Sequence, residues 1–156
     1  MITRTSNAPP IAYDQNITIR QDTTVNITLS ATDTDGDPLT FALIKTPSSG
    51  NLTGILPNLV YKPTSGINGT DNFTFLANDS IENSNVSMVK IIIPMLGDID
   101  MDNDVDNNDI NLIVAVRNTP ASGPNDLRDI NGDMKIDVLD ARKVTQLCTR
   151  PRCAIK

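Results

Sequence analysis

The chain has 156 residues and a formal net charge of −6, from 19 acidic and 13 basic side chains. No stretch concentrates Lys or Arg into a patch, which argues against a nucleic-acid interface, and no run of about 18 apolar residues predicts a membrane span. Histidine is absent, which excludes histidine-based catalytic triads and most zinc sites.

From Ile11 onward, short segments alternate between apolar and polar residues, as half-buried strands do. Turn residues at 33–38, 47–50 and 65–69 separate these segments. The spacing predicts an antiparallel sandwich of about seven strands. We expect strands at 16–20, 25–31, 39–44, 59–62, 72–77 and 86–93.

Three segments carry a family resemblance: Asn-Ala-Pro-Pro at 7–10, a segment at 24–40 that contains Asp-Thr-Asp-Gly-Asp-Pro-Leu-Thr, and Asn-Gly-Thr-Asp-Asn-Phe-Thr-Phe at 68–75. They resemble the bacterial and archaeal cadherin-like, or Ig-like, repeat over roughly residues 7–94. The resemblance implies a secreted, non-catalytic module that often occurs in tandem.

Inside this region, three aspartates stand two residues apart in one turn, and a fourth carboxylate elsewhere would complete a calcium site. The alternative is a simple Asp–Gly turn in which an aspartate caps its own backbone, and the sequence leaves both open. The possible metal ligands are Asp33, Asp35, Asp37, Asp71 and Asp79.

Beyond Gly97, carboxylates fall at positions 1, 3, 5, 9 and 12 of a twelve-residue frame, 98–109, and a second frame at 129–140 repeats the spacing. This is the ligand spacing of an EF-hand-type loop, in which position 7 contributes its carbonyl. We therefore predict two calcium ions. The residues at the ligand positions are Asp98, Asp100, Asp102, Asp104, Asp106 and Asp109, then Asp129, Asn131, Asp133, Lys135, Asp137 and Asp140.

Position 6 of such a loop is normally glycine because its φ is positive. Asn103 tolerates that conformation, whereas Met134 does so poorly. We expect the second loop to bind more weakly or with altered geometry, helped by Gly132. Val105 and Ile136, at position 8 of each loop, are expected to pair and fill the core between the loops.

Apolar residues at helical spacing follow each loop. A helix over 141–148 follows the second loop, a loop is predicted at 119–124, and the helix after Asp109 has as its apolar side Ile110, Ile113, Val114 and Val116. With Asp rather than Glu at position 12, the pattern resembles a type I dockerin over residues 97–149. The resemblance implies calcium-dependent folding of two antiparallel helices and binding to a cohesin domain on a partner. Two recognition positions precede each position-12 Asp, and two basic residues lie beside the second pair. The expected contact residues are Asn107, Asn108, Val138, Leu139, Arg142 and Lys143; burial of Val138 and Leu139 in the core is the alternative.

Cys148 and Cys153 stand five residues apart at the end of the last predicted helix. We expect a disulfide that closes a short loop, with free thiols as the alternative. The chain opens without a signal-peptide pattern. Because calcium loops of this kind suit calcium levels outside the cell, we expect an extracellular or cell-surface fragment of a larger secreted protein.

The sequence thus predicts a mixed two-domain fold: a linker at 1–8, an all-β Ig/cadherin-like antiparallel sandwich at 9–94, and a small α-helical dockerin with two calcium loops at 95–156. The expected function is a non-catalytic assembly module, monomeric on its own, that binds a cohesin on a scaffold or cell-surface protein. The alternative is a calcium-stapled adhesion or glycan-binding module, which needs an exposed aromatic platform. A hydrolase using paired carboxylates would need a pocket and a carboxyl of raised pKa, and carboxylates committed to calcium suit that role poorly.

Overall fold

The computed structural model describes residues 6–149 and 151–154. Its backbone falls into two compact units. The first holds the described residues of Met1–Ile17 together with Thr24–Lys62 and Asp71–Ile91, and the second holds Thr18–Thr23, Pro63–Thr70 and the described residues of Ile92–Lys156.

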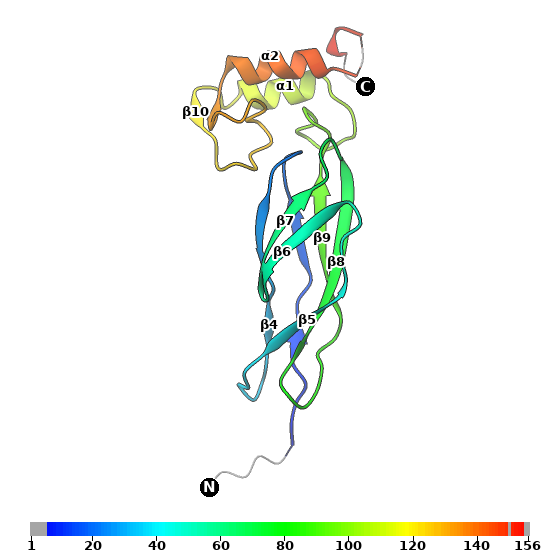
Figure 1. The fold of residues 1–156 in the computed structure, drawn as a ribbon. Helices are drawn as coiled ribbons and strands as arrows, with labels where there is room; N and C mark the ends of the chain where they lie inside the picture. Colours follow the sequence, from blue (N-terminus) through cyan, green and yellow to red (C-terminus); the bar gives the residue numbers. More distant parts are fainter. Residues whose placement is uncertain (1–5, 150, 155–156) are drawn as a thin grey trace. The chain divides into compact units, whose positions relative to one another are not determined.

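Most of the strands form two antiparallel-rich sheets (Figure 1). One sheet has the order β2-β9-β8-β5 and the other the order β3-β7-β6, while β1 and β4 form a separate pair. The bounds are β1 (Ile11–Ala12), β2 (Gln15–Thr18), β3 (Val25–Thr28), β4 (Ala31–Thr32), β5 (Thr40–Lys45), β6 (Gly50–Ile55), β7 (Asn58–Pro63), β8 (Gly69–Asn78) and β9 (Ser87–Ile93).

Alternation along β8 shows why these residues form a sandwich. Phe73, Phe75 and Ala77 are fully buried, and the residues between them are partly exposed. β8 pairs antiparallel with β5, and β3 pairs antiparallel with β7, so the apolar side chains of each sheet fall on a common face. The predicted β-sandwich is confirmed.

In the two larger sheets, β6 is the strand that was not predicted; the short strand β1 also lies outside the predicted segments. β6 contains two glycines, which lower the strand propensity of the segment, yet the packing requires the first of them. A Cβ atom on Gly50 would lie 2.4 Å from Cζ of the buried Tyr61. A glycine is required because β6 packs directly against the ring of Tyr61. The propensities of individual residues do not reveal this contact.

The second unit contains two helices, α1 (Asn107–Val114) and α2 (Val138–Leu147), which lie side by side and run antiparallel (Figure 1). Two short strands, β10 (Thr119–Pro120) and β11 (Lys135–Ile136), pair antiparallel where the sequence predicted a loop at 119–124, and a 3₁₀ turn, η1, covers Pro151–Cys153. No helix in the described part of the chain has the length and apolar character needed to cross a membrane.

Both helices begin three residues earlier than the sequence predicted. Asp106 is the N-cap of α1, and its carboxylate accepts the N–H of Asn108 at 2.7 Å, while Asp109 accepts the N–H of Asp106 at 2.8 Å. Asp137 and Asp140 form the same reciprocal capping box at α2. Positions 9 and 12 of each loop thus start the helix as well as standing in the ligand frame.

The second unit has its own small aliphatic core. Its buried members come from both loops and both helices, and partly buried side chains such as Met95 and Leu96 pack against them. The fully or nearly buried members are Val105, Ile113, Ile130, Ile136 and Val144. Both loop position-8 residues therefore fill this core, as predicted.

Candidate metal centre

In the first loop, the carboxylate oxygens of Asp98, Asp100 and Asp102 lie within 4.8 Å of one another. Asp98 is buried, and its two oxygens accept the backbone N–H groups of Asp102 and Asn103, each at 3.1 Å. These bonds curl the backbone around the carboxylate at position 1. The loop therefore gathers three acidic side chains at one point.

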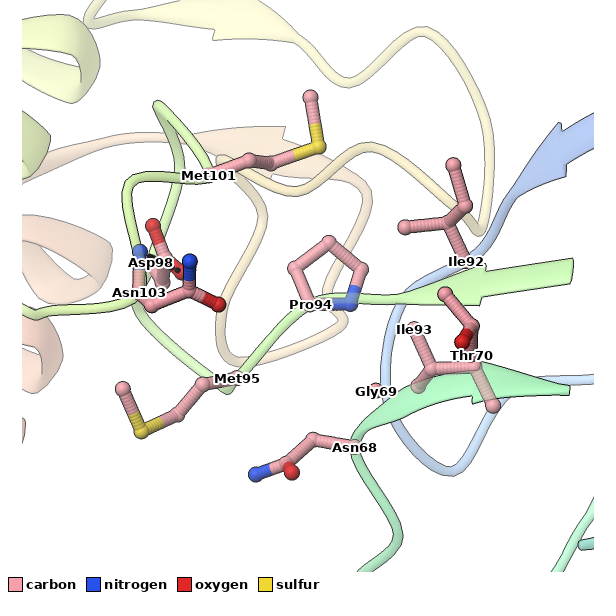
Figure 2. A pocket seen from close by; sticks show the side chains of 10 residues that line it. All are labelled: Asn68, Gly69, Thr70, Ile92, Ile93, Pro94, Met95, Asp98, Met101 and Asn103. Carbon is pink, nitrogen blue, oxygen red and sulfur yellow. Dashed lines mark hydrogen bonds between the residues drawn. The ribbon is translucent and has the colours of Figure 1, made fainter.

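Figure 2 shows Asp98 beside Asn103, with the side chain of Met101 directed away from them. The view looks into a pocket of the second unit that ten residues line. Asp98 is the one ionisable residue among them. The other two clustered carboxylates of the first loop, Asp100 and Asp102, do not line this pocket.

The acids at positions 9 and 12 complete the first loop from the start of α1. Asp109 accepts the N–H of Ile99 at 2.6 Å as well as that of Asp106, so it ties the beginning of the loop to its end. Asp106 is only 2% exposed, and its Oδ2 atom is buried without a hydrogen-bond partner among the described residues. An unpartnered buried carboxylate oxygen costs at least about 2 kcal/mol, and a cation within the loop would remove that cost.

The second loop repeats these bonds at the corresponding positions. Asp129 is buried and accepts the N–H groups of Asp133 at 3.1 Å and Met134 at 3.0 Å. Asn131 accepts from Asp133 at 3.0 Å, as Asp100 does from Asp102 in the first loop. The same carboxylate-to-backbone bonds therefore shape both loops.

The two loops also share their backbone conformation at position 6. Asn103 has φ of 70° and Met134 has φ of 67°, both in the left-handed region. At position 4, Met101 has φ of 62° and Gly132 has φ of 79°. Met134 therefore adopts the left-handed conformation that Asn103 has in the first loop, and altered calcium geometry at the second loop stays a prediction. Weaker binding at that loop remains our expectation.

Repulsion among the acids raises the free energy of the ionised first loop. Burial raises the pKa of Asp98, and the negative charge of Asp109 raises it further, against the backbone hydrogen bonds that lower it. Burial and the charge of Asp109 also raise the pKa of Asp100. An all-oxygen donor set that carries excess negative charge fits a hard divalent cation such as calcium.

The sandwich aspartates are arranged differently from the expectation. The oxygens of Asp33, Asp35 and Asp37 do gather within 4.8 Å, but Asp33 also accepts the N–H groups of Asp35 at 2.8 Å and Asp37 at 3.1 Å, as the Asp-capped turn requires. Asp71 and Asp79 lie at opposite ends of β8, roughly 25 Å apart by strand rise.

Register decides which of these two lies near the turn. Thr40, just beyond it, pairs with Asn78. Asp71, at the far end of β8, is therefore wrong as a ligand for this turn. Asp79 caps a turn of its own and accepts from the Asn7 amide at 2.9 Å; it remains a candidate.

The expected contact residues lie on the surface. Val138 is 64% and Leu139 is 49% exposed, so the alternative that they belong to the core is wrong. Arg142 and Lys143 follow one turn later and are exposed, as are Asn107 and Asn108 on α1. Leu112 and Val114 are also exposed on α1, although helical periodicity assigned Val114 to the apolar side.

Cys148 and Cys153 form a disulfide, with their Cα atoms 5.2 Å apart. Val105 and Ile136 share the core but do not pair with each other through their backbones. Ile136 pairs with Thr119, and Val105 bonds to Thr149. The two position-8 residues therefore share one core, as predicted, and each also bonds through its backbone to the segment that follows the helix of the opposite loop.

Comparison with known proteins concerns mainly the strand-rich part of the chain. Residues 7–92, more than half of the chain, match the family model of the bacterial Ig domain. An ulvan lyase, long isoform, from Glaciecola sp. (strain KUL10) is 40% identical over 90 residues, which are 55% of this chain and 8% of that protein. The chain thus spans a small part of this curated relative.

Solved structures with a similar arrangement are more distant. An endo-fucoidan hydrolase of glycoside hydrolase family 107 has a TM-score of 0.46 at 22% identity, covering 60% of this chain and 14% of its own. A nucleoside hydrolase-related protein from Saccharophagus degradans has a TM-score of 0.44 at 18% identity, covering 56% and 26%. These likenesses are too low to inform function. The family match over 7–92, on top of the observed sandwich, shows that the chain belongs to the bacterial Ig-domain family.

Proposed function

We propose that this chain is a non-catalytic extracellular assembly module, in which two calcium ions order a dockerin-like unit that docks onto a cohesin domain of a partner protein. The Ig domain supports that unit and joins it to the rest of a larger secreted protein. The observation that carries the proposal is the repetition, in both loops, of the same carboxylate-to-backbone hydrogen bonds.

Calcium, when bound, supplies the positive charge that the clustered carboxylates lack. The chain's own residues do the rest of the work. Side chains at positions 1, 3 and 5 fix the loop backbone, while the acids at positions 9 and 12 cap the helix that follows. Loading the loops therefore stabilises the start of α1 and α2, the part of the helices that carries the contact residues.

The docking surface that we assign lies on the first two turns of α2. Val138 and Leu139 present exposed apolar side chains, and Arg142 and Lys143 stand four residues further along the same faces. The corresponding positions of α1 are Asn107 and Asn108, which are uncharged and polar. Such a face fits a partner surface that is apolar at its centre and acidic at its rim.

Binding to cohesin domains tests the proposal. Cohesins from the same source, immobilised and exposed to the full chain with calcium or with chelator, should retain the chain only with calcium. Leu139→Glu should abolish retention, because it places a charge in the apolar centre. Asn108→Glu, the matched change on α1, should leave it intact. Retention that survives chelation, or that Asn108→Glu abolishes and Leu139→Glu does not, would contradict the assignment.

A second candidate is a carbohydrate-binding accessory module, which the similarity to an ulvan lyase favours. The aromatic residues of the described chain give it little support. Tyr61, Phe73 and Phe75 are fully buried, while Tyr13 is 43% exposed and its hydroxyl bonds to Thr32 at 2.6 Å. Retardation of the chain in an ulvan-containing gel, lost in Tyr13→Ala, would favour this function over docking.

A further inference from the structure

The residue after Cys148 is bonded to the first calcium loop through both backbone polar groups of one loop residue. The N–H of Thr149 donates to the carbonyl of Val105 at 3.0 Å, and the N–H of Val105 donates to Oγ1 of Thr149 at 3.1 Å. Val105 is the buried position-8 residue of that loop. Thr149, 44 residues away in sequence, therefore closes the loop from outside.

This contact bears on a metal-ligand position. In a planar trans peptide, the carbonyl of one residue and the N–H of the next point in opposite directions. When Thr149 holds the N–H of Val105, it turns the carbonyl of Asp104, the position-7 ligand of the first loop, to the side away from Thr149. Asp106, whose buried Oδ2 atom has no partner among the described residues, follows directly.

The second loop is held at the same position by a longer segment. Ile136 accepts the N–H of Asn118 at 2.7 Å, and its neighbours continue this contact as the β10–β11 ladder, with Ala121 donating to Met134 at 3.0 Å. The first loop has no such ladder among the described residues.

At the first loop, a disulfide bond rather than a strand ladder restrains the contacting segment. Cys148 and Cys153 are joined on either side of Thr149, and Cys153 is buried against the last turns of α2, its Sγ atom 3.8 Å from the carbonyl of Thr145. A short closed loop removes conformational freedom from the residues that it encloses. Thr149 is thereby kept where it meets Val105.

We propose that the Cys148–Cys153 disulfide is a redox-sensitive clasp that holds Thr149 on Val105 and so sets the calcium affinity of the first loop alone. The inference rests on the proposed function, since it takes the loops to bind calcium. A dithiol reductant opens the clasp by passing two electrons and two protons to the cystine, which leaves two thiols and converts the dithiol to its cyclic disulfide. The first loop is then fully competent only in an oxidising compartment.

Calcium titration of the full chain, followed by NMR at amides of each loop, tests the clasp. In Cys148→Ser/Cys153→Ser, or after reduction with dithiothreitol, the first loop should lose about tenfold in affinity, the size expected for one or two hydrogen bonds. The second loop should change less than about twofold. Equal losses in both loops, or none in the first, overturn the proposal.

A second variant keeps the disulfide and removes only the Thr149 hydroxyl, which accepts the N–H of Val105 at 3.1 Å and donates to the carbonyl of Val105 at 3.4 Å. Thr149→Val should weaken the first loop and speed amide exchange at Val105. Thr145→Val, the matched change one turn earlier, removes a hydroxyl that donates to the carbonyl of Ala141 within α2 and should do neither. Unchanged Val105 exchange in both the reduced protein and Thr149→Val overturns the clasp.

Exchange at Val105 also separates the two proposals. A chain that binds no calcium in either loop, oxidised or reduced, overturns the proposed function and the affinity claim with it. Faster Val105 exchange on reduction, measured with and without calcium, still supports the clasp itself in that case.

Discussion

The Ig domain and the second unit, which holds the two loops and is called the loop unit below, both bury carboxylates. They differ in the hydrogen bonds that these carboxylates accept. Asp71 in the Ig domain is 1% exposed, and its oxygens accept the N–H groups of Ser48 and Ser49 and the hydroxyl of Tyr61, at 2.8–2.9 Å. Asp106 in the first loop is as deeply buried, yet its Oδ2 atom has no partner among the described residues. The buried acid of the Ig domain has its own hydrogen-bond donors, whereas one buried carboxylate oxygen of the first loop has none among the described residues, which is where we propose a cation.

The acidities follow this difference. Burial on its own raises the pKa of Asp71, but the hydrogen bonds from Ser48, Tyr61 and their neighbours outweigh it and leave that pKa below its ordinary value. At Asp98, burial raises the pKa and the charge of Asp109 adds to it. The comparison teaches that burial alone does not raise the pKa of a carboxyl group: hydrogen-bond donors outweigh burial at Asp71, whereas a neighbouring carboxylate adds to it at Asp98.

The largest effect should come from removing a position-1 carboxylate. Asp98→Asn keeps the shape of the side chain but loses its charge and weakens two charge-assisted hydrogen bonds, a loss of about 3 kcal/mol. Calcium affinity of the first loop should fall more than about a hundredfold, by calorimetric titration. Asp129→Asn should do the same to the second loop. A change that weakens both loops equally would mean that the loops are not separate sites.

Shortening a side chain of the small aliphatic core should lower the free energy of unfolding by nearly as much. Ile113 is fully buried between the loops, so Ile113→Ala should lower the free energy of unfolding of the calcium-loaded loop unit by about 3 kcal/mol in a denaturant titration. Val114→Ala, at the next residue, which is 44% exposed, should change it by less than about 0.5 kcal/mol. Equal costs would place the core elsewhere.

The Ig domain offers the opposite test, since its buried acid needs no cation. Asp71→Asn should destabilise the Ig domain by about 2 kcal/mol at neutral pH, with or without calcium. Because the folded pKa lies below the unfolded one, this stabilisation is present above about pH 4 and is lost as the pH falls through the folded pKa. Thermal melts of both proteins across that range should therefore converge at low pH; a cost that stays constant would contradict the hydrogen-bond account.

The smallest effect should be a gain. Met134 occupies the left-handed region at φ of 67°, which costs a non-glycine residue about 1 kcal/mol. Met134→Gly should raise the stability of the calcium-loaded second loop by a similar amount, measured by its melting temperature. Asn103→Gly should gain less, because asparagine tolerates this conformation. A loss of stability in Met134→Gly would show that the methionine side chain packs productively.

Much of this arrangement is visible in the sequence, for reasons that are local. The alternation of apolar and polar residues over β8 and β9 is a short-range pattern, so the sandwich was predicted from it. The two-residue spacing of the carboxylates is also short-range, and it is the basis on which the two calcium loops were predicted. Helix starts were missed by a few residues because Asp106 and Asp137 act as caps as well as ligand candidates. The spacing of the aspartates in the sequence does not show that one side chain is both a helix cap and a candidate ligand.

Contacts between distant segments were beyond prediction. Gly50 lowers the strand propensity of β6, but a glycine is required there because the ring of Tyr61, on the next strand, leaves no room for a side chain. Val105 shares a core with Ile136, as expected, but its backbone bonds to Thr149, which was not expected. Asp71 matched the sandwich cluster in chemistry but stands at the wrong end of its strand. Such contacts depend on strand register and chain topology, which a short stretch of sequence does not reveal.

Far-ultraviolet circular dichroism of the full chain, with calcium and then with excess chelator, tests the central claim most directly. The account predicts that the helical signal of α1 and α2 is lost on chelation and restored by calcium, while the strand signal of the Ig domain persists. Full helical signal in the absence of calcium would contradict it, because the second unit would then fold on its aliphatic core alone.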